Sequence, residues 1–306
     1  MEIESAHEPR LWRASTGRTT ARRFQRMARA GTLQRLVPGV YLRPDDWDGL
    51  DARSRHLVLI RALAPRLPRD AAISHLSAAA VRGWAHIGRW PDRVQVTQAG
   101  RARSEISRVT VRSSPPFDAE RPGADTFAGV ELVSAAATAV GAVLDATFSR
   151  AVVLLDDAYR KGLRPAEVEP LVEQHGPRGR VHLERVLRTS DVRHESVGES
   201  FCAARLAELG FVDVVAQQEF PRQDGSVDRV DFWLPSVGFV VEFDGRQKYT
   251  DPTMTGGRAP ADVLWQEKIR EDRIRPQVNG FIRVRWWHLV DPDRLRALFR
   301  QFGLVP

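Results

Sequence analysis

Two neighbouring segments, VDRVDFWLP at 227–235 and VGFVVEFDG at 237–245, decide the fold of the last third of this chain. Both are short apolar runs, and the proline, serine and glycine between them favour a turn, so the pair is predicted to form a β-hairpin. A hairpin that closes symmetrically about residues 236 and 237 places Asp231 directly opposite Glu242.

Three acids would then share one face of the hairpin, because Asp244 follows Glu242 by two residues. Opposed side chains have Cβ atoms about 5 Å apart, and two carboxylates at that distance repel by roughly 3 kcal/mol at an effective dielectric of ~20. A divalent cation would offset this repulsion. The alternative is a solvated edge hairpin, but the apolar second segment favours a central strand, where acids need partners.

The composition is that of a soluble globular protein, with 306 residues, 42% hydrophobic and 28% charged. This length allows two or three domains, and the net charge of +7 favours a polyanionic partner, with nucleic acid first. A single cysteine, Cys202, fits a reducing compartment. The N-terminus does not resemble a signal peptide, and the longest weakly polar stretch, 132–144, is too short to cross a bilayer. We expect a cytoplasmic protein without a membrane segment.

The first predicted region, residues 1–48, is strongly basic. No acid occurs between Arg10 and Arg43, a span rich in arginine. Residues 20–30 are predicted to form a helix, and two short strands, 33–37 and 40–42, flank a Pro-Gly turn. A helix followed by a basic hairpin resembles a winged-helix DNA reader, and its candidate DNA contacts are Arg22, Arg23, Arg26 and Arg35. The alternative is a solvated basic face.

Residues 49–190 are predicted to form an α/β region that continues into a helical link. The predicted helices are 53–64, 71–84, 132–144, 148–161, 165–174 and 180–188, and the predicted strands are 93–97 and 108–112. Residues 114–128 are expected to be a connection. Asp156 and Asp157 are expected on the surface of their helix.

The last region, 191–306, is predicted to contain a helix, three strands, a helix, a strand and a helix. Ser196 and Glu199 match a capping box that opens the first helix. The predicted elements are the helix 196–210, the strands 212–220, 227–235 and 237–245, the helix 262–278, the strand 281–286 and the helix 292–302.

Lysine is rare in this chain, with only Lys161, Lys248 and Lys268 among 46 basic residues. Two of the three follow closely behind Glu242. A lysine can shift its pKa and orient a water molecule, which an arginine cannot do as readily. Lys248 and Lys268 are therefore candidate site residues, with chance placement as the alternative.

The order of elements in 194–306, together with these acids, resembles the PD-(D/E)XK nuclease superfamily, and more narrowly its branch similar to very-short-patch repair endonucleases. The resemblance assigns the two strand acids to Asp231 and Glu242 and the helix acid to Glu199, or alternatively to Glu195. It implies a restriction-endonuclease-like mixed sheet flanked by helices. This chain departs from the superfamily at Asp244, where a lysine is usual.

Residues 10–115 resemble the winged-helix and α/β region of AbiEi-like antitoxins, through the basic helix and the Val-Pro-Gly-Val-Tyr hairpin. The two resemblances together imply a multi-domain α/β protein that binds DNA and hydrolyses its phosphodiester bonds. The alternative is a non-catalytic, antitoxin-like transcriptional regulator with a degenerate nuclease fold. A homodimer and a toxin or defence-system partner stay open.

The catalytic set implied by the resemblance is Glu199, Asp231, Glu242, Asp244, Lys248 and Lys268. Mg²⁺ or Mn²⁺ is the implied cofactor, with Asp231, Glu242 and Asp244 as its candidate ligands. The metal would activate a bound water and neutralise phosphate charge. Further candidate contacts to the DNA backbone are Arg270, Arg273, Arg283 and Arg285.

Overall fold

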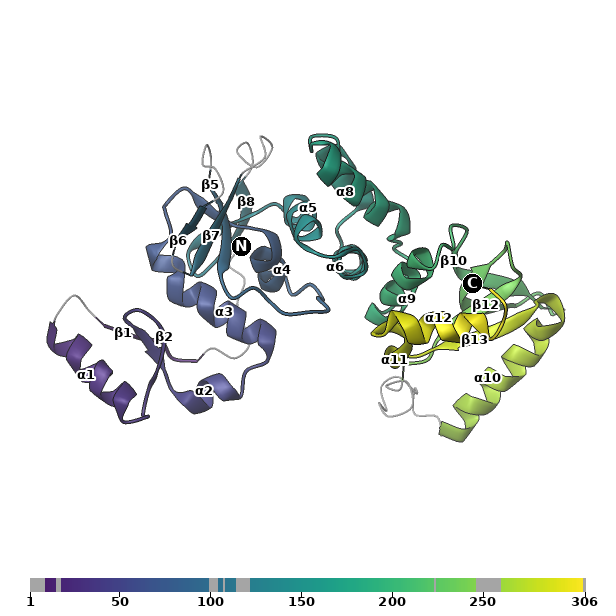
Figure 1. Cartoon of the computed structure of the whole chain (residues 1–306), viewed down its shortest axis with the longest axis horizontal. Coiled ribbons are helices and arrows are strands. Elements are labelled where there is room, and N and C mark those ends of the chain that lie inside the picture. Colours follow the sequence, from purple (N-terminus) through teal and green to yellow (C-terminus); the bar gives the residue numbers. More distant parts are fainter. Residues whose placement is uncertain are drawn as a thin grey trace. The chain divides into compact units, whose positions relative to one another are not determined.

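The computed structural model divides the chain into two compact units (Figure 1). The first contains residues 1–154 and 161–184, and the second contains residues 155–160 and 185–306. The structure describes residues 9–14, 18–98, 104–106, 108–113, 122–222, 224–245 and 260–304. In this described part, no helix has the length and apolar character needed to cross a membrane.

The first unit begins with a helix and a small three-stranded sheet. The helix is α1 (Arg18–Arg29), and the strands β1 (Trp12–Arg13), β2 (Gln34–Val37) and β3 (Val40–Leu42) are ordered β1-β3-β2. Gly39 adopts a φ of 73° in the turn between β2 and β3, a conformation that glycine tolerates best. Phe24, Leu33 and Tyr41 form the small core. The predicted helix and hairpin are confirmed, with boundaries shifted by one or two residues.

The other described strands of this unit form a mixed six-stranded sheet with the order β6-β7-β5-β4-β9-β8. Its strands are β4 (Ala71–Ile73), β5 (Val94–Gln98), β6 (Ser104–Ile106), β7 (Val109–Ser113), β8 (Pro122–Phe127) and β9 (Val130–Val133). Its helices are α2 (Pro44–Asp48), α3 (Ala52–Leu63), the 3₁₀ turn η1 (Ala64–Arg66), α4 (His75–Val81), α5 (Ala135–Asp145) and α7 (Pro165–Val172). The helices α6 (Phe148–Arg160) and α8 (Pro177–Thr189) contribute to both units.

Three predicted segments of this region are wrong in part. Residues 71–73 form β4 instead of the start of a helix, because Ile73 pairs with Val96 on one side and Leu132 on the other. Likewise, residues 132 and 133 belong to β9, and Ser134 caps α5 only after them. The expected connection 114–128 contains β8 at 122–127, and its residues 114–121 lie outside the described part. Strand pairing to distant residues overrides local helical preference at residues 71–73 and 132–133.

The prediction that Asp156 and Asp157 lie on the surface is also wrong. Asp156 is 0% exposed and Asp157 is 7% exposed. The stretch 151–159 of α6 is buried all round, so its acids can only be accommodated with polar partners. His194 and Arg160 supply those partners.

The second unit is built on a mixed four-stranded sheet. Its strands β10 (Val215–Pro221), β11 (Val227–Leu234), β12 (Phe239–Phe243) and β13 (Gly280–Val284) lie in sequence order. β10, β11 and β12 are antiparallel neighbours, whereas β12 and β13 are parallel. The helices are α9 (Val197–Glu208), α10 (Pro260–Ile274), the 3₁₀ turn η4 (Arg275–Gln277), α11 (Trp286–Leu289) and α12 (Pro292–Arg300). The predicted order of elements is confirmed, with α11 as an additional short helix.

Two helices fix the surroundings of β12. α10 packs Ile274 into a cluster with Val230 and Val240. α9 meets β12 at Gly198, where an added Cβ would lie only 2.0 Å from the ring of Phe243. The helix approaches the strand this closely because Gly198 has no side chain.

Candidate functional site

The hairpin of β11 and β12 brings Asp231 and Glu242 together. Its register pairs Phe232 with Val241 and Trp233 with Val240, so one further step places Asp231 opposite Glu242. The backbone N–H of Phe243 donates to Asp231 Oδ2 at 2.8 Å, which orients this carboxylate toward β12. The predicted register is confirmed. β12 is also an interior strand, as its apolar sequence predicts, because β11 and β13 flank it.

The two acids line a cavity of about 70 Å³ in the second unit, together with Phe243, Asp244, Glu267, Arg270 and Arg283. Asp231 and Glu242 come from the antiparallel hairpin, Arg283 from the parallel neighbour β13, and Glu267 and Arg270 from α10. A water molecule occupies ~30 Å³ of liquid volume. The cavity can therefore hold a small ion or a few water molecules.

The surroundings of Glu242 disfavour the charged form of its side chain. Burial raises its pKa, and the nearby charges of Asp231 and Glu267 raise it further. The guanidinium of Arg270 opposes this shift most strongly, with its Nη2 2.7 Å from Glu242 Oε1, and Arg283 opposes it less. The repulsion expected from the sequence is thus present, and Arg270 offsets part of it.

Asp244 lines the same cavity but has a different partner. Arg285 donates from Nε to Asp244 Oδ2 at 2.9 Å, and its guanidinium lies 5.0 Å from the centre of the Trp287 ring. Asp244, where the sequence resemblance leads one to expect a lysine, is therefore paired with an arginine that directly follows β13.

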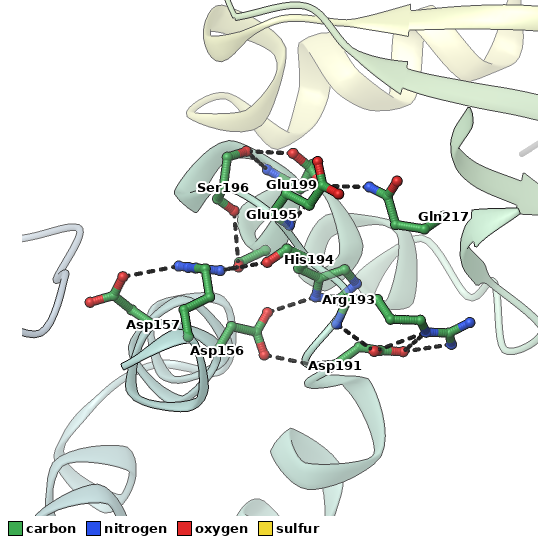
Figure 2. A network of polar contacts seen from close by, with 11 residues as sticks. Asp156, Asp157, Asp191, Arg193, His194, Glu195, Ser196, Glu199 and Gln217 are labelled. Atoms are coloured by element: carbon green, nitrogen blue, oxygen red, sulfur yellow. Dashed lines mark hydrogen bonds and ion pairs between the residues drawn. The ribbon is translucent and has the colours of Figure 1, made fainter. Parts of the chain in front are cut away.

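Glu199 has a capping role in the structure (Figure 2). Ser196 Oγ accepts from the Glu199 N–H at 3.1 Å and donates to Glu199 Oε1 at 2.8 Å. Glu199 Oε2 accepts from the Glu195 N–H and from Gln217 Nε2, both at 2.9 Å. The predicted capping box is confirmed, and Glu199 does not line the cavity. Glu195, the alternative helix acid, pairs instead with Arg229 at 2.7 Å.

One observation links Glu199 to the cavity acids. The pKa of the buried Cys202 thiol is raised well above its usual value, first by burial and then by the charges of Asp231 and Glu199. Both carboxylates therefore act on the same buried thiol. Burial and this negative field keep Cys202 in its neutral form.

Of the two candidate lysines, the structure describes only Lys268, and it does not line the cavity. Lys268 lies on α10, is exposed, and is absent from the cavity lining. Lys248 lies outside the described residues. The basic groups that the structure places at the cavity are Arg270 and Arg283.

The donor chemistry of the cavity suits a hard cation. Among the described residues, no three His, Cys, Asp or Glu side chains lie close enough to form a metal-binding group, so Asp231, Glu242 and Asp244 do not form the expected three-ligand set. Mg²⁺, however, is usually bound through one or two carboxylates, and waters and substrate phosphates complete its coordination. The opposed pair Asp231 and Glu242 meets that requirement.

The arginines predicted to contact DNA divide into two groups. Arg270, Arg273, Arg283 and Arg285 each pair with an acid of the second unit: Glu242, Asp228, Glu271 and Asp244 respectively. The fork of Arg273 is bidentate, at 2.8 and 2.7 Å, and it contributes most to lowering the pKa of Asp228 to about 2. The charges of these four arginines are largely engaged within the protein.

The arginines of the first unit are different. Arg22, Arg23 and Arg26 are exposed on α1, on the side away from the buried Phe24, and Arg35 is exposed on β2. Over the described residues, none of these four forms an ion pair. The helix and hairpin therefore present uncompensated positive charge to solvent.

The sequence analysis missed Glu267 and the role of Arg270 as the partner of Glu242. Glu267 precedes the already suspected Lys268 and lies three residues before Arg270, one helical turn, so the three positions mark one stretch of α10. Which of these three side chains face β12 depends on how α10 packs on the sheet. The local sequence of the helix does not specify that packing.

Comparisons with known proteins find little. No family model matches the sequence, and no curated protein matches it. Among solved structures, the crystal structure of the RV2827C protein from Mycobacterium tuberculosis is 18% identical, with a TM-score of 0.35. The match covers 61% of this chain and 70% of that chain. A likeness at this distance assigns no family.

Proposed function

We propose that this chain binds DNA and that its second unit is a Mg²⁺- or Mn²⁺-dependent endonuclease that hydrolyses phosphodiester bonds. The observation that carries the proposal is the opposition of Asp231 and Glu242 at one cavity, where the pKa of Glu242 stays raised despite its contact with Arg270. A site that holds like charges together at a cost in stability indicates a role other than folding.

In this proposal, Asp231 and Glu242 would hold the metal ion. When bound, the metal would lower the pKa of a water molecule and neutralise charge on the scissile phosphate. The Phe243 N–H keeps Asp231 oriented at 2.8 Å. Arg270 Nη2 lies 2.7 Å from Glu242 Oε1. The planar guanidinium of Arg270 would turn toward a phosphate oxygen. Glu267, on the same wall, is a candidate proton acceptor.

The first unit would supply affinity for DNA. The exposed side of α1 and the β2–β3 hairpin carry arginines without acidic partners among the described residues. Phosphate contacts of this kind give binding that weakens steeply with salt and carries little sequence information.

A nicking assay tests the enzymatic proposal. Supercoiled plasmid with Mg²⁺ or Mn²⁺ is expected to be cut by the wild type and left intact by Asp231→Asn and Glu242→Gln. Glu219→Gln is the matched control, because Glu219 is an exposed acid on β10 away from the cavity lining. Undiminished cutting by both site variants would refute the assignment.

A second candidate is a non-catalytic, antitoxin-like regulator that binds DNA. The ion pairs of Arg270 with Glu242 and of Arg285 with Asp244 favour it, because each acid already has an arginine partner without a metal. The exposure of Lys268 also favours it. DNA binding without any cutting, at all metal concentrations tested, would select this candidate.

A further inference from the structure

The first unit contains a cavity of about 460 Å³ that the proposed nuclease chemistry does not use. It is lined by residues of β2, of α2, of the start of α3, and of the segment 88–92. Its volume falls within the range of roughly 300–1,000 Å³ that small-molecule sites occupy. Within the described residues, the cavity is thus large enough for an organic ligand.

The wall of this cavity is strongly basic. Arg35, Arg55, Arg89 and Arg108 line it, against one acid, Asp92. Arg55 donates to the backbone carbonyls of Trp47 and Asp48, each at 3.2 Å, and Arg108 donates to that of Asp92 at 3.2 Å. These carbonyls are neutral, and none of the four arginines forms an ion pair with a described residue. The cavity therefore favours an anionic ligand.

Planar side chains form the other part of the wall. Trp47 and Trp90 are half-buried, and both line the cavity. His56 stacks on Trp90 with an angle of 15° between the rings, and the guanidinium of Arg55 lies 5.4 Å from the centre of the Trp47 ring. Aromatic and guanidinium planes of this kind are the surfaces on which nucleic-acid bases stack.

His56 adds one buried ring nitrogen that has no hydrogen-bond partner among the described residues. Ser77 Oγ accepts from the Gln95 N–H at 2.9 Å and lies 2.8 Å from His56 Nε2, so this ring nitrogen has a hydrogen-bond partner. The other ring nitrogen, Nδ1, has no hydrogen-bond partner among the described residues.

The histidine is neutral at physiological pH. Burial lowers the pKa of His56 to about 4, and the Pro91 carbonyl and the charge of Asp92 oppose this only in part. The Pro91 carbonyl is near the ring but completes no hydrogen bond with Nδ1. A buried ring nitrogen without a hydrogen-bond partner, in the wall of a basic cavity, indicates a missing polar group.

We propose that this cavity binds a nucleotide, with its base against Trp47 and Trp90 and its phosphate held by Arg35, Arg89 and Arg108. The nucleotide could be free or part of a DNA strand, and the chemistry of recognition is the same. Arg35 belongs both to the cavity and to the proposed DNA surface. Binding of a nucleotide within a DNA strand rests on the proposed function. Binding of a free nucleotide does not, because it does not require that the chain binds DNA.

Photocrosslinking with 5-iodouracil tests the proposal, because this base reacts on irradiation with an aromatic side chain that it contacts. The full chain is irradiated with 5-iodo-deoxyuridine monophosphate in one arm and with a duplex containing 5-iodouracil in the other. Mass spectrometry is expected to find the adduct on Trp47 or Trp90 in at least one arm. A free-nucleotide adduct identifies a soluble ligand, and an adduct only with the duplex identifies a base of bound DNA.

Variants separate this site from non-specific contact. Arg89→Ala plus Arg108→Ala is expected to reduce the adduct about tenfold or more, since charge-assisted contacts to the phosphate are lost. The control is Arg69→Ala, an exposed arginine outside the cavity lining. Unchanged thermal unfolding checks that each variant folds.

Absence of an adduct on both tryptophans in both arms overturns the proposal. So does an adduct that the double arginine variant leaves unchanged. Either result would leave the nuclease proposal standing if plasmid is still cut. Conversely, loss of plasmid cutting with an intact free-nucleotide adduct would overturn only the nuclease proposal.

Discussion

The pKa of Glu242 depends on its burial and on the charges around it at the candidate site. Its side chain is 16% exposed on an interior strand, and burial together with Asp231 keeps its pKa raised despite the contact with Arg270. A carboxyl group whose folded-state pKa is raised binds its proton more tightly in the folded than in the unfolded protein. It therefore reduces stability as pH rises from the unfolded pKa through the folded pKa.

The variant Glu242→Gln removes this pH-dependent cost. We expect the difference in melting temperature, variant minus wild type, to increase between pH 4 and pH 8. Thermal unfolding of both proteins across this range measures it, with Glu219→Gln as the exposed control. A difference that stays constant or falls with pH would contradict the environment described for Glu242.

The buried pair of Asp156 and His194 makes a second prediction at this scale (Figure 2). Asp156 Oδ2 lies 2.7 Å from His194 Nδ1, and Asp156 Oδ1 accepts from the Asp191 N–H at 3.0 Å. Asp156→Ala leaves both donors buried without a partner, so we expect a loss of about 3–5 kcal/mol of stability. Asp156→Asn, which keeps an acceptor, should lose less.

Urea denaturation gives the free energy of unfolding for these variants. Asp293→Ala is a suitable control, because its side chain is 92% exposed and its pair with Arg296 is on the surface. If Asp156→Ala destabilises the protein no more than this control, the buried pair does not contribute as described.

Part of the candidate site could be predicted from the local sequence. The opposition of Asp231 and Glu242 follows from a short hairpin, whose register is local and set by its turn. The contributions of Glu267 and Arg270 could not be predicted, because α10 follows a long segment after β12 and its orientation depends on tertiary packing. The structural use of both Glu199 oxygens was also hidden, although its capping box was predicted.

At the scale of elements, the contact of α9 with β12 depends on one glycine. A Cβ at Gly198 would lie 2.0 Å from the Phe243 ring, which itself packs edge-on against Trp286 at 5.5 Å. Gly198→Ala must therefore displace either the helix or the ring. We expect a loss of about 1–3 kcal/mol, although alanine is the better helix former.

Denaturant unfolding measures the effect of Gly198→Ala on stability. Gly179→Ala is a milder comparison in another helix, since its added Cβ would lie 3.3 Å from the end of the Leu144 side chain. A stabilised Gly198→Ala variant would show that α9 and β12 are not in close contact.

The elements themselves were largely predictable from the sequence. The order of helices and strands in 191–306 follows from apolar alternation and turn residues, which are local signals. β4 was missed because its strand character comes from pairing with β5 and β9, which are distant in the sequence. Ala71–Ile73, with two alanines, has a helical preference that this pairing overrides. β8 pairs with β9 across a short turn, inside a segment expected to be a connection.

At the scale of the whole molecule, the net charge is +7. The arginines of the described residues differ in whether they have acidic partners. The arginines around the acidic cavity are paired with carboxylates, whereas Arg22, Arg23 and Arg26 of α1 have no acidic partner in the part of the chain that the structure describes. We therefore expect α1 to provide much of the salt-dependent affinity for DNA.

The double variant Arg22→Ala plus Arg23→Ala tests this distribution. If each arginine neutralises one phosphate, the slope of log K against log salt should become shallower by about 2. Fluorescence anisotropy with a labelled duplex measures the slope. Arg69→Ala plus Arg188→Ala, a pair of exposed arginines elsewhere, removes the same charge. Equal slopes for both double variants would argue against a specific DNA-binding role of α1.

The central claim is that Asp231 and Glu242 together hold a divalent cation, and calorimetric titration of Mn²⁺ into the whole protein tests it most directly. The wild type is expected to bind the ion saturably, Asp231→Asn is expected to lose that binding, and Glu219→Gln is expected to retain it. Equal binding by the wild type and Asp231→Asn, or no binding by the wild type, would contradict the claim.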